Sequence, residues 1–161
     1  MHKRSAGILL FRGAGGTDDG LEVLLGHMGG PFWARRDAGA WTVVKGEYEP
    51  DEAPSAAARR EFREELGLPV PDGELLPLGE TRLSGGKVVT VWALAGDLDP
   101  SRAVPGTFTM EWPKGSGRIQ EFPEIDRAAW LDLRQAREKI VPGQRVFLDR
   151  LAELRARPGG R

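Results

Sequence analysis

Three glutamates lie in one short segment of the sequence, REFREELG, where their carboxylates could act together. If the segment is helical, Glu61, Glu64 and Glu65 fall within about 100° of arc, with Glu64 and Glu65 one turn beyond Glu61. Like charges at this spacing cost an isolated helix a few tenths of a kcal/mol for each pair, so positive charge should compensate. The arginines of the same segment could do this as a salt-bridged surface helix, and a divalent cation could do it by coordination. The segment therefore indicates either a solvated helix face or a metal site.

Composition narrows the kind of metal that such a site could hold. The 161 residues include no cysteine and only two histidines, so thiolate sites are excluded and oxygen ligands remain. Magnesium, manganese or calcium would suit such ligands. Lys plus Arg is 23 against 24 for Asp plus Glu, so no general electrostatic attraction to nucleic acid or membrane surfaces is expected.

The spacing of residues around the three glutamates is more specific than their composition. From Gly46 to Leu68 the order is Gly, five residues, Glu, seven residues, Arg-Glu, an apolar residue, Arg, Glu-Glu, Leu, Gly and an apolar residue. At average residue usage, a chance match to this pattern is rarer than about one in a million for each start. The pattern resembles, without a mismatch, the signature of the Nudix hydrolases. The surface-helix interpretation is correspondingly weak.

This resemblance implies a fold, an activity and a cofactor. The fold would be an α/β/α sandwich with a central mixed β-sheet, in which the signature forms a loop, helix and loop. The activity would be hydrolysis of a nucleoside diphosphate linked to another moiety, with Mg²⁺ or Mn²⁺. Metal ions and basic groups suit this reaction because the pyrophosphate carries dense negative charge.

The resemblance also implies roles for residues at matching positions. Glu61, Glu64, Glu65 and the carbonyl of Gly46 would bind the metal. Arg60 would orient the carboxylates through a charge-assisted hydrogen bond, and Glu52 would tie the loop to the helix. Gly46 and Gly67 also have backbone explanations, as a tight turn and a helix end.

The group that activates water has several candidates. Some Nudix enzymes use a glutamate of the signature, which here would be Glu64, and others use an acid on a loop before the last strand. Glu124 lies six residues before Trp130, where such a loop acid is expected, and Glu121 is the second choice. Loop acids are usually only solvated, so the catalytic role of Glu124 competes with a surface role.

Basic residues outside the signature are candidates for phosphate binding. Lys45 precedes Gly46, as lysine does in the Nudix branches that cut dinucleoside polyphosphates and inositol pyrophosphates, although Val44 replaces their usual proline. Lys87 opens a predicted strand, and Arg35 and Arg36 lie in a glycine-containing loop that could close over polyphosphate. Each of these four could instead be a solvated surface charge.

Aromatic residues offer candidates for stacking on a base, which contributes roughly 1–3 kcal/mol for each base. Trp33 and Tyr48 lie in predicted loops near the signature and are the better candidates. The tryptophans inside strand patterns are expected to pack in the core, and His27 is expected to be incidental because the metal ligands are oxygens. Trp112 and Lys114, on a predicted hairpin, could instead form an interface.

The elements that must position these residues follow from hydrophobic periodicity and turn residues. Ala58, Phe62 and Leu66 recur every four residues between Pro54 and Gly67, which predicts a helix over 54–66. Further helices are predicted over 133–140 and 144–157. Strands are predicted over 5–11, 21–26, 41–44, 75–83, 87–95, 107–112, 118–122 and 128–131. Mixed strands and helices in one chain of this length predict a single α/β domain over 1–161.

The substrate cannot be read from these patterns. A dinucleoside polyphosphate or nucleoside triphosphate is expected first, an ADP-ribose or nucleotide-sugar pyrophosphatase second, and a non-catalytic nucleotide-sensing module third. The third is disfavoured because every acid of the signature is present. No apolar run approaches a signal or membrane segment, so a cytoplasmic monomer or homodimer is expected, with no nucleic-acid or membrane partner.

Overall fold

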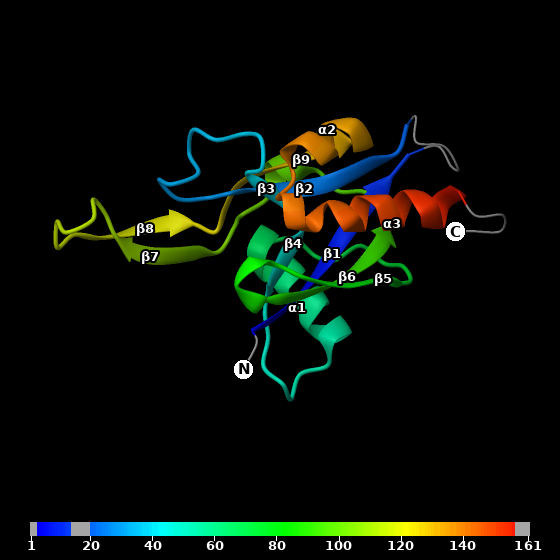
Figure 1. Ribbon diagram of the computed structural model, residues 1–161, viewed down its shortest axis with the longest axis horizontal. Coiled ribbons are helices and arrows are strands. Elements are labelled where there is room, and N and C mark those ends of the chain that lie inside the picture. The colour runs from blue at the N-terminus through cyan, green and yellow to red at the C-terminus, as the bar shows by residue number, and fades with distance from the viewer. Residues whose placement is uncertain (1–2, 14–19, 157–161) are drawn as a thin grey trace.

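The computed structural model describes residues 3–13 and 20–156 and builds them around a mixed β-sheet (Figure 1). The central strand β1 (Arg4–Arg12) runs parallel to β6 (Val88–Ala95) and antiparallel to β2 (Glu22–Met28). Strands β3 (Trp41–Thr42) and β9 (Ile125–Asp132) both pair with β2, β4 (Val44–Glu47) pairs with β1, and β5 (Leu76–Arg82) pairs with β6. The turn predicted between the first two strands lies mostly outside the described residues.

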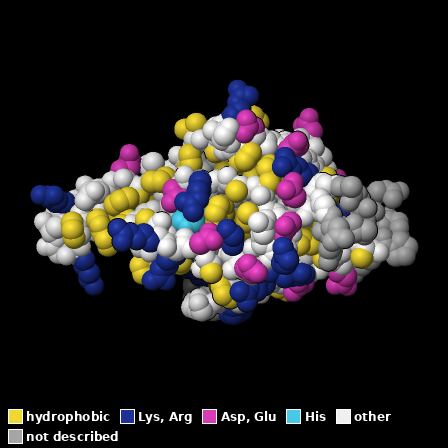
Figure 2. All heavy atoms as spheres, turned by 90° about the horizontal axis from the view of Figure 1, so that it is seen from above, with side chains coloured by type: hydrophobic (Ala, Val, Ile, Leu, Met, Phe, Trp, Pro, Cys, Tyr) yellow, Lys and Arg dark blue, Asp and Glu magenta, His cyan; other side chains and the backbone are white. Residues whose placement is uncertain are grey.

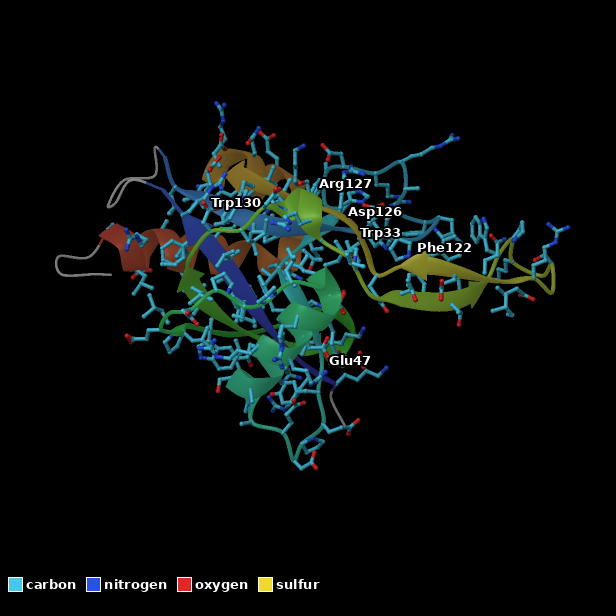
Figure 3. The ribbon with its side chains drawn as sticks, turned by 180° about the vertical axis from the view of Figure 1, so that it is seen from behind. Trp33, Glu47, Phe122, Asp126, Arg127 and Trp130 are labelled. Atoms are coloured by element: carbon cyan, nitrogen blue, oxygen red, sulfur yellow. The ribbon has the colours of Figure 1, made fainter. Side chains whose placement is uncertain are left out.

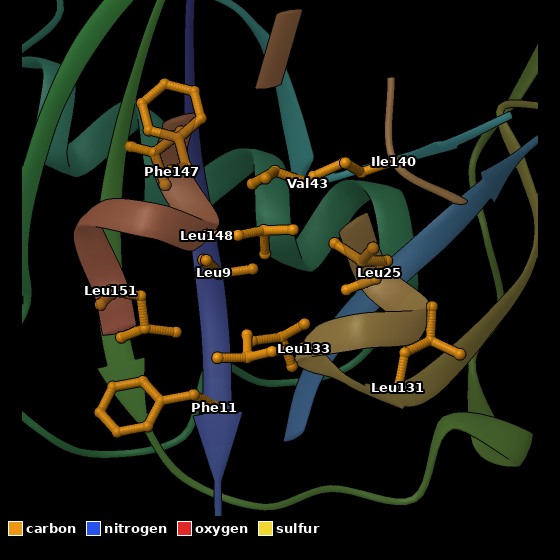
Figure 4. Packing of buried hydrophobic residues seen from close by; sticks show 14 of the residues in the cluster. Leu9, Phe11, Leu25, Val43, Leu131, Leu133, Ile140, Phe147, Leu148 and Leu151 are labelled. Carbon is orange, nitrogen blue, oxygen red and sulfur yellow. The ribbon is translucent and has the colours of Figure 1, made fainter. Parts of the chain in front are cut away.

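Helices cover both faces of the sheet because successive residues of β1 point to opposite sides. Ile8 and Leu10 belong to a core cluster shared with α1 (Pro54–Leu66). Leu9 and Phe11 belong to the other cluster, shared with α2 (Leu133–Lys139) and α3 (Arg145–Ala156), as Figure 4 shows. The expected α/β/α sandwich with a mixed sheet is therefore confirmed.

Two strands stand apart from the main sheet. β7 (Thr107–Glu111) and β8 (Ile119–Pro123) pair only with one another and form a hairpin that projects from the body of the molecule (Figure 1). Short 3-10 turns at Ser84–Gly86, Pro100–Arg102 and Pro142–Gln144 complete the elements. None of the helices within 3–13 and 20–156 has the length and apolarity needed to cross a membrane.

The predicted strand over 41–44 is wrong in one respect. The chain leaves β2 after Thr42 and joins β1 from Val44, so this segment forms two short strands on different partners. Gly46 consequently lies inside β4, opposite Ala6, and not after a strand end. The other predicted elements are present with small shifts at their ends, and β9 begins three residues before the predicted 128–131.

Candidate active site

Helix α1 begins and ends as its sequence indicates, which sets the orientation of its glutamates. Pro54 occupies the first turn, and Gly67 takes a left-handed conformation with φ of 64° while its N–H donates to the Arg63 carbonyl. Phe62 and Leu66 are fully buried against the sheet. This packing brings Glu61 into contact with β4, where its exposed fraction is only 7%.

Arg60 holds the carboxylates of this segment in place. Its Nε and Nη2 donate to the two oxygens of Glu52 at 2.8 Å each, a bidentate pair. Its Nη1 donates to Glu61 Oε1 at 2.7 Å and to Glu64 Oε2 at 3.1 Å. The Arg60 guanidinium lowers the pKa of Glu52, and these carboxylates raise the pKa of Arg60. Arg60 thus bonds three carboxylates of this segment at once.

Gly46 leaves room for the carboxylate of Glu61. A Cβ atom added to Gly46 would stand 1.8 Å from Glu61 Oε2 and 2.1 Å from its Cδ. One oxygen of Glu61 therefore faces Arg60, and the other lies against the backbone of Gly46. Burial raises the pKa of Glu61, and Arg60 opposes that shift.

A series of backbone hydrogen bonds joins the end of α1 to Glu124. The Gly106 N–H donates to the Glu64 carbonyl at 3.2 Å, and the Glu124 N–H donates to the Gly106 carbonyl at 2.8 Å. The Gly29 N–H in turn donates to the Glu124 carbonyl at 3.0 Å. Glu124, the single residue between β8 and β9, is therefore fixed beside the carboxylates of α1.

The raised pKa of Glu65 agrees with the position of Glu124 beside α1. Burial, followed by repulsion from Glu124 and Glu61, raises the pKa of Glu65 to about 7, although Lys45 acts in the opposite direction. The four carboxylates at positions 61, 64, 65 and 124 thus concentrate negative charge that nearby side chains only partly compensate.

Lys45 is a second basic residue that interacts electrostatically with these carboxylates. It is half-buried on β4, and burial, followed by repulsion from Lys87, lowers its pKa, while Glu65, Glu47 and Glu61 raise it. Lys87 lies nearby with its Nζ 4.0 Å from Glu47. Lys3 Nζ approaches the same Glu47 carboxylate at 4.0 Å, a neighbour that sequence reasoning did not find.

The loop over 29–40 places the other predicted binding residues in different surroundings. Arg36 lies over the ring of Phe32, with its guanidinium carbon 4.4 Å from the ring centre, and Arg35 is exposed. Trp33 is partly buried against the core. Tyr48 packs against the opposite core cluster, and its neighbour Glu47 lies well apart from Trp33 in Figure 3, so the structure does not bring the two predicted stacking residues together.

His27 has a structural function that sequence reasoning missed. It is completely buried, and its ring nitrogens lie 2.8 Å from Asp126 Oδ1 and 2.6 Å from the Arg36 carbonyl. The histidine thereby joins the loop over 29–40 to β9. No sequence pattern indicates this, because residues 27, 36 and 126 meet only through the pairing of β2 with β9.

The donor set suits a hard divalent cation, although the carboxylates do not converge by themselves. Among the described residues, no three His, Cys, Asp or Glu side chains meet closely enough to hold a metal ion. Glu61 and Glu64 each give one oxygen to Arg60. Burial, followed by repulsion from Glu124 and Glu61, raises the pKa of Glu65, so a cation bound beside it would favour its charged form.

Comparison with known proteins identifies the family of the chain. The family model for the NUDIX domain matches residues 1–151. A search of curated proteins found no match.

Solved structures with the same fold include proteins of several activities. A C. elegans Ap4A hydrolase in a binary complex aligns with a TM-score of 0.59 and 21% identity, over 92% of this chain and 96% of its own. The NUDIX domain of Shewanella oneidensis NrtR, complexed with ADP ribose, aligns with a TM-score of 0.62 and 15% identity, over 95% of this chain and 88% of its own. The MutT protein from Methanosarcina mazei Go1 aligns with a TM-score of 0.56 and 20% identity, over 94% of each chain. With the family model, these findings show that the chain belongs to the Nudix hydrolases, enzymes that act on phosphoric anhydride bonds.

Proposed function

We propose that the chain hydrolyses a pyrophosphate bond in a nucleoside diphosphate joined to another moiety, with a dinucleoside polyphosphate or a nucleoside triphosphate as the first candidate substrate. The observation that carries this proposal is the group of four carboxylates at positions 61, 64, 65 and 124, organised by Arg60 and bordered by Lys45. A module without catalytic activity would not need Glu124, an acid from outside the signature, held beside an intact signature.

Mg²⁺ or Mn²⁺ would be held by Glu61, Glu64, Glu65 and the Gly46 carbonyl. When bound, the ion would neutralise phosphate charge and lower the pKa of coordinated water. Arg60 keeps the carboxylates oriented, as partners of metal ligands do elsewhere. Lys45 and Lys87 would add positive charge where phosphate oxygens approach.

Glu64 and Glu124 are the two groups proposed to remove a proton from the attacking water. Glu64 is half-exposed and accepts one hydrogen bond from Arg60, and Glu124 lies next to Glu65. Replacing each by glutamine preserves size and removes the charge. The variant that loses more kcat with little change in KM identifies the base, because general bases typically contribute 10²–10⁴-fold.

The decisive experiment is a substrate panel of dinucleoside polyphosphates, canonical and oxidised nucleoside triphosphates, ADP-ribose and nucleotide sugars. Each is assayed with Mg²⁺ and with Mn²⁺, with product identification in ¹⁸O-water to locate the attacked phosphorus. The matched control is Glu138→Gln, because Glu138 is exposed on α2 away from the signature. Metal-dependent turnover that survives Glu64→Gln and Glu124→Gln together would overturn the assignment of the site.

ADP-ribose or a nucleotide sugar is the second candidate substrate. A structural neighbour, the NrtR NUDIX domain, was solved with ADP ribose, which is why these compounds belong in the panel. The cytoplasmic location and the choice between monomer and homodimer stay predictions from the sequence.

A further inference from the structure

The projecting hairpin leaves the backbone of β7 unpaired along one edge. Within residues 3–13 and 20–156, β7 pairs with β8 and with no other strand. Backbone hydrogen bonds from Trp112 to Arg118 at the tip and from Glu124 to Gly106 at the base join even-numbered residues of β7 to β8. Its odd-numbered residues therefore point their N–H and C=O groups away from β8. These residues are Thr107, Thr109 and Glu111.

The two edges of the hairpin differ in whether a second copy of the chain could pair with them. On β8 the outward backbone groups belong to Ile119, Glu121 and Pro123, the partners of the odd-numbered residues of β7. Pro123 has no N–H to donate, and a twofold axis at Glu121 would bring two carboxylates together. Proline and charge protect an edge strand from pairing, so the edge of β8 is blocked. The edge of β7 has no proline and has an uncharged threonine at its centre.

The strand β7 is self-complementary in an antiparallel register centred on Thr109. In that register Thr107 lies opposite the partner's Glu111 on each side of the axis, and the outward backbone groups bond to one another. Phe108 lies opposite the partner's Met110, and no two like charges meet. Both side chains are half-buried in the single chain, so pairing would cover more of their apolar surface.

The same register covers exposed apolar side chains at both ends of β7. Trp112 is 37% exposed beyond one end, and Val104 is 71% exposed before the other. One residue beyond the paired strands, the partner's Trp112 lies opposite Gly106, whose lack of a side chain leaves room for the indole. Val104 is two residues from Gly106 and is a diagonal neighbour of that ring. Each copy thus meets the other through the same residues, as a closed twofold dimer requires.

The tip of the hairpin is positively charged. Residues 112–118 include Lys114 and Arg118, both exposed, and no acid. The carboxylate of Glu111, at the end of β7, accepts hydrogen bonds from two backbone N–H groups of the turn. Figure 2 shows lysine and arginine side chains beside hydrophobic ones at the end of the molecule where the hairpin projects. A surface that binds the tip should therefore carry exposed carboxylates.

The register centred on Thr109 brings the tip to such a surface, the end of α1. The partner's Lys114 lies level with Val104, whose N–H donates to the Leu66 carbonyl at 2.7 Å. Glu64 is two residues earlier on the same helix, and 57% of its side chain is exposed. The basic tip and the carboxylate site are therefore complementary in charge, which identifies a second copy of the chain as the partner.

We propose that two copies of the chain dimerise through the outer edge of β7 and that each supplies Lys114 to the carboxylate site of the other. The ammonium group would add positive charge where phosphate oxygens approach. The dimer follows from the hairpin alone, and only the assignment of Lys114 rests on the proposed function. The pairing edge has five residues, so the interface is expected to be small and the dimer to dissociate on dilution.

Single-cysteine cross-linking tests the register, because the chain has no cysteine of its own. The Cα atoms of a hydrogen-bonded antiparallel pair lie about 5.5 Å apart, which a disulfide can span. Thr109→Cys should therefore form a covalent dimer under mild oxidation. Thr107→Cys and Ile119→Cys are the matched controls and should not, because neither residue meets its own copy across the axis. Absence of the dimer at position 109, or equal cross-linking of all three variants, would overturn the register.

Sedimentation over about 5–500 μM protein measures the association itself. Thr109→Pro removes an outward N–H and keeps the bonds to β8, so the dissociation constant should rise at least about tenfold. Ile119→Pro removes the equivalent N–H from the edge of β8 and should leave the dissociation constant unchanged. A wild-type chain that stays monomeric throughout, or equal losses in the two variants, would overturn the dimer. Cross-linking at position 109 decides the case in which both prolines disturb the hairpin.

Mixing two impaired variants tests the contribution of Lys114. Lys114→Ala should lower kcat/KM with the best panel substrate at least about tenfold, and Arg134→Ala, exposed on α2, is the matched control. An equal mixture of Lys114→Ala with Glu64→Gln contains mixed dimers with one complete site and should regain about a quarter of wild-type activity. Thr109→Pro in both chains should abolish that recovery. No recovery from mixed dimers would overturn the role of Lys114, whereas a cross-linked dimer without turnover on any substrate would overturn the proposed function and support the dimer.

Discussion

Replacing Gly46 by alanine tests how closely the sheet and α1 position the metal-binding carboxylates. Gly46 does not have a positive φ, so its backbone accepts alanine without strain. The added methyl group would stand 1.8 Å from Glu61 Oε2, where ordinary contact begins at 3.4 Å. The carboxylate must therefore move by about 1.5 Å, and the Gly46 carbonyl stays in place, which separates the side-chain effect from the proposed ligand role.

The size of the effect can be worked from these contacts. A misplacement of about 1 Å costs up to about 10²-fold in rate, so kcat should fall about 100-fold. Loss of the Arg60–Glu61 hydrogen bond costs about 1–2 kcal/mol after allowance for partial exposure, and alanine offsets about 0.4–1 kcal/mol by restricting the unfolded chain. The net loss of about 1 kcal/mol should lower the unfolding temperature by about 2–4 °C for a chain of this size.

A double-mutant cycle with Glu61→Ala shows whether the methyl group acts through Glu61. Removing that carboxylate clears the space, so Gly46→Ala should then add less than about twofold to the loss of turnover and almost nothing to the loss of stability. Kinetics with the best panel substrate and thermal unfolding without metal measure both. Additive losses in the cycle, or a Gly46→Ala enzyme with more than half the wild-type kcat, would refute this account of the site.

Three further changes follow from the same contacts. Arg60→Lys keeps the charge but loses the bidentate pair with Glu52. The free energy of unfolding, measured in urea, should therefore fall by about 1–2 kcal/mol, and kcat should fall at least about tenfold. An unchanged kcat would contradict the orienting role of Arg60. Because the pKa of Glu65 is raised to about 7 from 4.5, the folded protein retains a proton that the unfolded chain releases, so metal-free stability should fall as pH rises from 4.5 to 7. Mg²⁺ should then raise the unfolding temperature more at pH 8 than at pH 5.5, and Glu65→Gln should flatten both trends. His27→Ala removes a fully buried ring bonded to Asp126 and the Arg36 carbonyl, so it should cost about 2–4 kcal/mol and speed proteolysis within 29–40, whereas unchanged cleavage would show that the loop is held by other contacts.

Local patterns predicted the parts of the molecule whose causes are local. The helix over 54–66 follows from Pro54, Gly67 and a four-residue apolar spacing, and the structure has the same bounds. The resemblance also implied that Arg60 bonds the carboxylates of its own helix, and the structure has these bonds to Glu61 and Glu64. The bidentate bond from Arg60 to Glu52 was not predicted. These features depend on residues within one loop and one helix.

Contacts between distant segments could not be predicted in the same way. The segment 41–44 reads as one strand because it is apolar, yet it changes partner at Val43, pairing first with β2 and then with β1. His27 shows no ligand pattern, and its function arises only when β9 brings Asp126 beside β2. Sequence reasoning likewise did not place the loop over 29–40 against the hairpin, because the meeting of Gly30 with Phe108 is set by tertiary packing.

The position of Glu124 shows why backbone hydrogen bonding, rather than side-chain type, decides which acids join the site. Glu121 and Glu124 were both reasonable loop acids, but Glu121 lies within β8 and accepts a hydrogen bond from Thr107 across the hairpin. Glu124 has its N–H bonded to Gly106 and its carbonyl bonded to Gly29, and Gly106 is in turn bonded to Glu64. These bonds connect the base of the hairpin and the loop after β2 with the end of α1 through Glu124. Substitutions at Gly106 should therefore change both KM and kcat with the best panel substrate, because Gly106 bonds the Glu64 carbonyl and the Glu124 N–H.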